Sequence, residues 1–259
     1  MAPTGTPVVF IHGLWLGASS WQPWVDLFTA RGYSPMAPTW PGESESIELA
    51  RSHPEDAAGF GIDEVAGHFA AIIEKLDRPP IIIGHSFGGM IAEKLLGENY
   101  GIAAIAIDAA QIKGVLPLPV FKNPANAHRA VSLSADEFHY GFGNAVSPEE
   151  SEALWEAWNI PSPGKPLFEA AGANFSHNSP AKVNTENQAR GPLLLIMGGK
   201  DHTVPEAITK ATLKQYKDSS AITDLVEFAD RGHSLTIDSG WREVAEECLT
   251  WLDSQTLTA

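Results

Sequence analysis

Cysteine is almost absent from this sequence, since Cys248 is the only one in 259 residues. An internal disulfide is therefore excluded, which is compatible with a reducing compartment. Cys248 falls in an apolar pattern at helical spacing near the C-terminus, so we expect it in the core. The sequence also lacks a cysteine and histidine cluster and a glycine-rich phosphate loop at its first strand. Neither a metal nor an organic cofactor is implied.

Basic residues are scarce: the sequence has 17 lysines and arginines but 32 acidic residues, which gives a formal net charge of −15. This balance excludes nucleic acid and anionic membranes as partners, since binding phosphate relies on clustered cations. The longest apolar run, residues 102–110, is about half the ~20 residues of a membrane span and contains Asp108. The N-terminus shows neither a basic region nor an apolar signal segment. We expect a cytoplasmic protein without membrane insertion.

Short β-branched and apolar runs alternate with helical patterns along most of the chain. Amphipathic spacing predicts helices over 62–76 and 90–96, the second directly after a strand. This alternation predicts an α/β fold with a mainly parallel, doubly wound sheet of about six strands and helices on both faces. The expected strands are 8–11, 34–39, 81–83, 102–107, 192–197 and 223–228.

The alternation stops between residues 111 and 190, where prolines and bulky aromatic residues accumulate. Ser147 to Glu150 has the residues of a capping box with proline at the first helical position, which predicts a helix over 148–158. We therefore expect a core formed by residues 1–110 and 191–259, and a mostly helical insertion over 111–190.

The stretch Gly84-His85-Ser86-Phe87-Gly88 is a G-x-S-x-G sequence that follows three isoleucines and precedes a helix. In such a tight strand-to-helix turn the serine backbone is strained, and the residues two before and two after it must lack side chains. Ser86 is expected to stand exposed at the tip. The N–H of Phe87, at the positive end of the helix, would point at an oxyanion forming on Ser86.

In this context the motif resembles that of the α/β-hydrolase superfamily, in its serine esterase and lipase-like branch. The resemblance implies that the loop after the first strand, with its His12-Gly13 pair, supplies a second oxyanion N–H. That N–H would come from Leu14, with Trp15 as the second choice. It also implies that the insertion over 111–190 is a lid above the active site.

The resemblance implies a catalytic triad in the chain order serine, acid, histidine. Ser86, Asp201 and His233 each follow a predicted strand, and all three would meet at the C-terminal edge of the sheet. Asp108 also ends a strand and remains the alternative acid, although Asp201 after its Gly-Gly turn is preferred.

The implied activity is hydrolysis of a carboxylic ester through an acyl-enzyme on Ser86, with a small, apolar or aromatic molecule as the substrate. A serine in place of an aspartate nucleophile disfavours epoxide hydrolases and dehalogenases, and Gly13 with Ser234 disfavours hydroxynitrile lyases. A thioesterase or lactonase with the same triad, or a small-molecule receptor with little turnover, remains an alternative.

The sequence carries no signal of oligomeric state. Aromatic residues expected to bind substrate are Trp15, Phe142, Trp155 and Trp158.

Overall fold

The computed structural model describes residues 5–44, 46–115 and 124–257. Its centre is a six-stranded sheet in the order β2-β1-β3-β4-β7-β8, and all neighbouring strands are parallel. This confirms the predicted doubly wound sheet. The strands are β1 (Pro7–Ile11), β2 (Ser34–Met36), β3 (Ile81–His85), β4 (Ala103–Ile107), β7 (Leu193–Gly198) and β8 (Thr223–Phe228).

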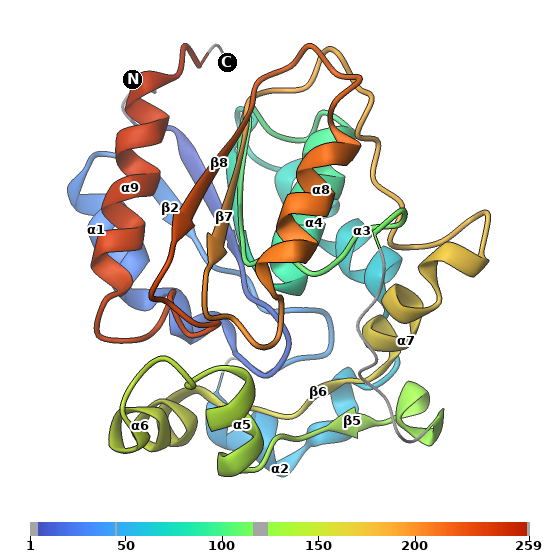
Figure 1. Ribbon diagram of the computed structural model, residues 1–259, viewed down its shortest axis with the longest axis vertical. Helices are drawn as coiled ribbons and strands as arrows, with labels where there is room; N and C mark the ends of the chain where they lie inside the picture. Colours follow the sequence, from blue (N-terminus) through green and yellow to red (C-terminus); the bar gives the residue numbers. More distant parts are fainter. Residues whose placement is uncertain (1–4, 45, 116–123, 258–259) are drawn as a thin grey trace.

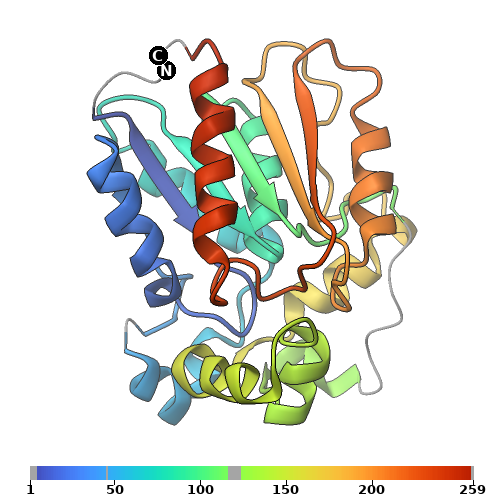
Figure 2. The same cartoon turned by 60° about the vertical axis from the view of Figure 1, so that its left-hand side comes forward.

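Helices cover both faces of the sheet, as Figures 1 and 2 show. One face carries α1 (Gln22–Ala30) and α9 (Trp241–Ser254), and the other carries α3 (Ile62–Ile73), α4 (Phe87–Gly97) and α8 (Glu206–Gln215). Side chains that alternate along each strand enter two separate cores, so Val8 packs with α1 and α9 while Val9 packs with α3 and α4. Cys248 of α9 is fully buried, as expected.

Several element boundaries differ from the predictions. Helix α4 begins at Phe87, whose N–H was expected at the start of this helix, and so precedes the apolar spacing that starts at Met90; the N–H groups of a first helical turn need no partner within the helix, and glycines are tolerated there. Strand β2 has three residues. It lies at the sheet edge and stops before Pro38, whose nitrogen cannot donate to a ladder.

Between β4 and β7, the described residues 130–163 lie across the C-terminal ends of the strands (Figures 1 and 2). We call residues 124–190 the inserted segment; residues 116–123, which carry some of the prolines and aromatics noted above, lie outside the described residues. The predicted helix over 148–158 is confirmed as α6, but the small sheet of β5 and β6 was not expected. The segment contains η3 (Pro124–His128), β5 (Ala130–Val131), α5 (Ala135–Gly141), α6 (Pro148–Trp158), β6 (Ser162–Pro163), α7 (Lys165–Ala171) and η4 (Ala173–Phe175).

Three short helices outside the inserted segment complete the elements: η1 (Ala18–Trp21), α2 (Ile47–Ser52) and η2 (Pro54–Ala57). Arg51 of α2 donates hydrogen bonds to the carbonyl oxygens of Asn159 at 2.9 Å and Glu156 at 2.8 Å, which fastens α2 to the inserted segment. In the described part of the chain, no helix has the length and apolar character needed to cross a membrane.

Glu93 on α4 is an ionisable group inside the core, only 1% exposed. The Tyr216 hydroxyl donates to its Oε2 at 2.6 Å, and the Arg190 guanidinium lies over the Tyr216 ring, 4.9 Å from the ring centroid. Burial raises the pKa of Glu93 to about 8, although the hydrogen bond from Tyr216 and the charge of Arg190 oppose the shift. The folded state therefore holds this proton more tightly than the unfolded chain does.

This pKa predicts that stability falls as the pH rises. Between the ordinary value of 4.5 and about 8, the folded state binds more protons than the unfolded state, so the free energy of unfolding decreases across that window. The full shift corresponds to at most about 5 kcal/mol. Glu93→Gln keeps an acceptor for Tyr216 and removes the titration, so urea unfolding of this variant at pH 5 and pH 8 should show a much smaller difference than wild type.

Glu74 offers a matched control, because Tyr100 donates to its Oε1 at 3.3 Å in an equivalent pair on the surface. Glu74→Gln should leave the pH dependence unchanged. An equal pH dependence in Glu93→Gln and wild type would show that Glu93 does not carry it.

Candidate active site

Ser86 occupies the turn between β3 and α4 in a left-handed conformation, with φ at +56°. A Cβ on Gly84 would come within 2.0 Å of the Gly88 carbonyl oxygen, and a Cβ on Gly88 within 2.1 Å of the Ile11 carbonyl oxygen. The two glycines are therefore required for this close approach, as the motif predicts. The expected exposure of Ser86 is wrong: it is only 4% exposed. The inserted segment, which lies across this edge of the sheet, explains the difference.

His233 and Asp201 meet in the loops that follow β8 and β7. The His233 Nδ1–H donates to Asp201 Oδ2 at 2.5 Å, and both side chains are buried. The other carboxylate oxygen accepts the N–H groups of Thr203 at 2.6 Å and Val204 at 2.8 Å. Burial alone would raise the pKa of Asp201, but His233 and the hydrogen bond from the Val204 N–H lower it below its ordinary value. Asp201 therefore stays ionised and can stabilise a protonated imidazole.

The remaining ring nitrogen of His233, Nε2, is buried and has no hydrogen-bond partner within the described residues. The imidazole of His85, which directly precedes Ser86, lies 4.5 Å from the His233 ring between centroids. His233 thus lies beside the Ser86 turn with one nitrogen unoccupied. Catalytic hydrogen bonds are often long before substrate binds, and this arrangement leaves Nε2 available to accept a proton.

Asp108 directly follows β4, which lies next to β7 in the sheet, and its backbone has φ at +42°. Its Oδ1 accepts the Gly198 N–H at 2.7 Å. Burial and the neighbouring carboxylate of Asp201 raise the pKa of Asp108 well above its ordinary range, so this carboxyl holds a proton. The hydrogen bond to His233 comes from Asp201, so the geometry favours Asp201 as the acid partner.

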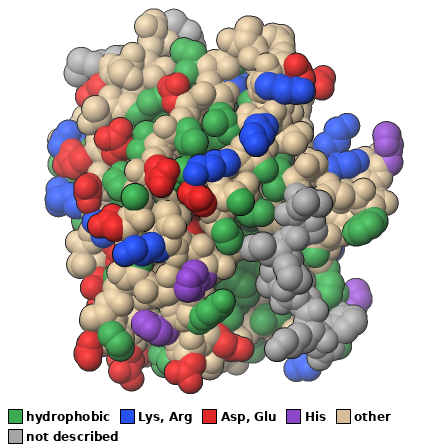
Figure 3. Space-filling model, in the orientation of Figure 1, with side chains coloured by type: hydrophobic (Ala, Val, Ile, Leu, Met, Phe, Trp, Pro, Cys, Tyr) green, Lys and Arg blue, Asp and Glu red, His purple; other side chains and the backbone are tan. Residues whose placement is uncertain are grey.

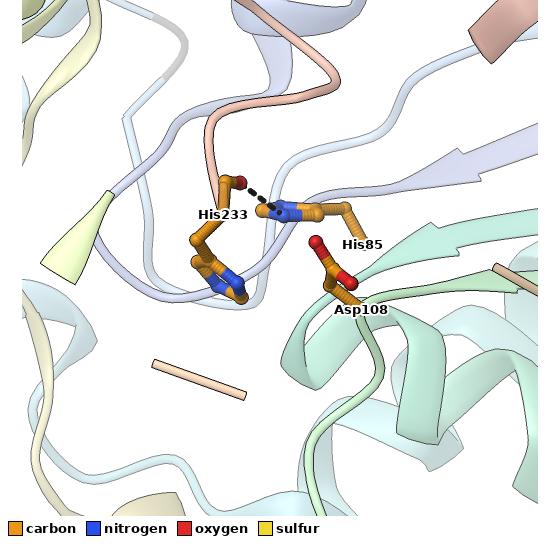
Figure 4. Close-up of side chains that lie close together, drawn as sticks. All are labelled: His85, Asp108 and His233. Carbon is orange, nitrogen blue, oxygen red and sulfur yellow. Dashed lines mark hydrogen bonds between the residues drawn. The ribbon is translucent and has the colours of Figure 1, made fainter. Parts of the chain in front are cut away.

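His85 positions the backbone of His233, a role that the sequence reasoning missed. Burial lowers the pKa of His85 well below its ordinary value, and the neutral ring donates its Nε2–H to the His233 carbonyl oxygen at 2.9 Å. Figure 4 shows this bond, with the Asp108 carboxyl facing the two imidazoles. The only signal in the sequence was the place of His85 inside the G-x-S-x-G motif.

His85, Asp108 and His233 are also a set of described residues that could offer ligands to a metal ion. One donor atom from each lies within 4.8 Å of the others. The raised pKa of Asp108 means that a cation would first have to displace its proton, and a cation held by His233 would occupy the proposed base. We therefore interpret the cluster as the buried surroundings of the His233–Asp201 pair and not as a metal centre.

The loop after β1 lies directly against Ser86. A Cβ on Gly13 would come within 2.6 Å of the Ser86 Cβ, so only glycine allows this approach. The N–H groups of Leu14 and Phe87, the two expected oxyanion donors, are used by no hydrogen bond within the described residues. The Trp15 N–H, the second choice, donates to Ser162 Oγ at 2.6 Å and is therefore occupied.

His12 braces this loop. Its Nε2 pairs with Glu43 Oε2 at 2.8 Å, and its ring stacks on Trp40 with the centroids 5.6 Å apart. Burial opposes a charge on His12, but Glu43 raises its pKa above the ordinary value. His12 is paired away from Ser86 and is not placed as its base.

A cavity of about 420 Å³ opens above Ser86, between the sheet and the inserted segment. Figure 3, in the orientation of Figure 1, shows hydrophobic side chains set back in a hollow in the lower half of the view. Trp15 and Phe142, two of the four aromatics expected at the substrate, line the cavity. Its wall is formed by Trp15, Ser86, Phe87, Ala110, Gln111, Leu133, Glu137, Tyr140, Gly141, Phe142, Leu167, His202, Thr203 and Val204.

The structure does not bring Trp155 and Trp158 to this cavity, which corrects the expectation that they bind substrate. The Trp155 indole N–H donates to the Leu133 carbonyl oxygen at 3.0 Å and holds α6 against the chain before α5. Trp158 lines a separate depression on the surface with residues of α1 and α9. Both lie on α6, and the helical pattern alone did not show which partner each face would meet.

Comparison with known proteins gives relatives over nearly the whole chain. The sequence profile of the Alpha/beta hydrolase family matches residues 8–247. A non-heme chloroperoxidase of Streptomyces lividans is 28% identical over 244 residues, which cover 82% of this chain and 84% of that protein.

Two solved structures share the fold. A monoacylglycerol lipase of Paleococcus ferrophilus aligns with a TM-score of 0.71 at 20% identity, covering 98% of this chain and 97% of its own. A methylesterase from Arabidopsis aligns with a TM-score of 0.68 at 18% identity, covering 96% of this chain and 100% of its own.

Proposed function

The chain belongs to the alpha/beta hydrolase family, and from this premise we propose that it is a serine hydrolase that cleaves a carboxylic ester. The observation that carries the proposal is the buried His233–Asp201 pair beside the Ser86 turn. A serine hydroxyl is a poor nucleophile at neutral pH and needs a base whose tautomer is fixed by a third group. Asp201 fixes that tautomer, because it accepts the Nδ1 proton and leaves Nε2 as the acceptor.

In the proposed mechanism, Ser86 Oγ attacks the ester carbonyl carbon while His233 Nε2 takes the hydroxyl proton. The imidazolium that forms is stabilised by the ionised Asp201. The tetrahedral intermediate collapses, the C–O bond to the alcohol breaks, and His233 returns the proton to the leaving alkoxide. A water molecule then attacks the acyl-enzyme with His233 again acting as base, which releases the carboxylic acid and restores Ser86.

The negative oxygen of the tetrahedral intermediate would be held by the N–H groups of Leu14 and Phe87. The Phe87 N–H is at the first residue of α4, where the helix dipole favours negative charge. Gly13 allows the loop after β1, which carries Leu14, to approach Ser86 closely. The loss of one such donor costs about 3 kcal/mol of transition-state stabilisation.

The cavity supports a small substrate with an apolar or aromatic group. Trp15, Phe142 and Leu167 are among its apolar lining residues, and about 420 Å³ suits a compact ester. In this proposal the core is formed by 1–110 and 191–259, and the insertion over 111–190 acts as the lid that shapes the cavity. The same triad would serve a thioester or a lactone, and esters are proposed because a methylesterase and a lipase share the fold.

Labelling with a fluorophosphonate, followed by peptide mass mapping, tests the proposal. We expect a single covalent adduct on Ser86, because only a serine activated by a base reacts quickly with this probe. Saturating the protein first with a p-nitrophenyl ester of a short acid should slow the labelling. Absence of an adduct on folded protein would contradict hydrolase activity and favour a receptor that binds without turnover.

A further inference from the structure

Trp15, in the proposed oxyanion loop, is held by the inserted segment through three hydrogen bonds. Its backbone N–H donates to Ser162 Oγ at 2.6 Å, and its carbonyl oxygen accepts the Ile160 N–H at 3.0 Å. Its indole N–H donates to the Val131 carbonyl oxygen at 3.1 Å. Ser162 and Val131 are partners across the β5–β6 ladder, so two of the three bonds reach adjacent points of one small sheet.

The backbone of Trp15 needs such support. Its φ is +66°, in the left-handed region, which is unfavourable for a bulky side chain by about 1–3 kcal/mol. A residue keeps this conformation only where its surroundings enforce it. Trp15 is 8% exposed and Ser162 is 4% exposed, so water does not compete easily for the bond between them.

We propose that Ser162 is a positioning residue of the oxyanion hole, which accepts the Trp15 N–H and thereby fixes the orientation of the Leu14 N–H toward Ser86. The inference rests on the proposed function. Ser162 lies 147 positions from Trp15 in the sequence and does not line the cavity, so it acts through the loop and not on the substrate.

The loop geometry explains why this bond matters for Leu14. On one side of Leu14, Gly13 is packed so closely on Ser86 that no Cβ fits between them. On the other side, the peptide that joins Leu14 to Trp15 is fixed by Ser162. Leu14 is therefore held at both ends, with its N–H unused by the rest of the described chain. Without the Ser162 hydroxyl, the buried Trp15 N–H loses its partner and this peptide can rotate.

The oxyanion exists only in the transition state and the tetrahedral intermediate, so misplacing its donor should reduce kcat and leave KM nearly unchanged. Ser162→Ala is expected to lower kcat for p-nitrophenyl butyrate by about 10–100-fold, less than the full loss of a donor. The affinity for a trifluoromethyl ketone with the same acyl chain, which forms a tetrahedral adduct on serine, should fall by a similar factor. Ser162→Thr, which keeps the hydroxyl, should restore most of kcat.

Ser151→Ala is the matched control, because Ser151 is a buried serine of the same inserted segment whose hydroxyl has no hydrogen-bond partner within the described residues. It should match wild type in kcat and in affinity for the ketone. If wild type hydrolyses the ester and Ser162→Ala matches it in kcat, the positioning role is wrong while the proposed function stands. The inference is also overturned if the loss of kcat in Ser162→Ala is accompanied by a lowered Tm. The same holds if Ser162→Thr does not restore kcat. If wild type shows no turnover and no labelling of Ser86, both proposals fall together.

Discussion

Replacing Ser86 with alanine is expected to lower kcat by about 10⁵–10⁶-fold for every ester that the wild-type protein hydrolyses. The nucleophile is lost, while His233, Asp201 and the two proposed N–H donors remain in place. Alanine fits the space that serine occupies, so the strained turn with φ at +56° should persist and the Tm should stay within a few degrees of wild type. Steady-state kinetics on p-nitrophenyl esters and thermal unfolding measure the two effects.

The triad also predicts strong non-additivity. His233→Ala should lose nearly as much activity as Ser86→Ala, and the double variant should lose little more, because the two groups act as one unit. Ser176→Ala, on the exposed surface of the inserted segment, serves as the control and should match wild type. Retention of near-full activity in Ser86→Ala would remove Ser86 from the mechanism.

The sequence was sufficient to predict the sheet and the Ser86 turn because both depend on local patterns. The β-branched run over 81–83 and the glycines around Ser86 fix a buried strand and a tight turn within about ten residues. Ser86, Asp201 and His233 each follow a predicted strand, so all three were expected at the C-terminal edge of the parallel sheet. The alternation of strands and helices predicted a parallel sheet of about six strands, and the order of those strands came only from the structure.

Features that depend on contacts between distant segments could not be predicted in the same way. The burial of Ser86 and the bond from Trp15 to Ser162 depend on contacts between the core and the inserted segment, and the β5–β6 ladder joins two distant parts of that segment. The aromatic content of that segment predicted apolar packing but not the direction of each side chain. The sequence therefore could not show that Phe142 lines the cavity whereas Trp158 lies in a separate surface depression. The role of His85 is similarly set by the loop that carries His233, far away in the sequence.

The choice between Asp108 and Asp201 illustrates a limit of a different kind. Both residues follow buried strands, and β4 and β7 are neighbours in the sheet, so both carboxyl groups arrive at the same place. The sequence pattern is satisfied by either one. Burial of two carboxyls together allows only one to ionise readily, and the bond to His233 selects Asp201 for that role.

Asp201→Asn is therefore expected to lower kcat by about 10⁴-fold, whereas Asp108→Asn should stay within about 10-fold of wild type. An amide at position 201 cannot hold His233 with its proton on Nδ1 as a carboxylate does, so Nε2 loses its role as acceptor. Asp108 already carries a proton, and an amide there is likewise neutral and can still accept the Gly198 N–H.

The pair of variants separates the two acids because both replacements are nearly isosteric and both sites are buried. Asp108→Ala adds a further comparison: it removes the acceptor of the Gly198 N–H beside Asp201, so it should lose more activity than Asp108→Asn while the Tm of Asp108→Asn remains near wild type. The kcat of each variant on one p-nitrophenyl ester decides the assignment. A large loss in Asp108→Asn together with a small loss in Asp201→Asn would reverse it, and would make Asp108 the group that orients His233 during catalysis.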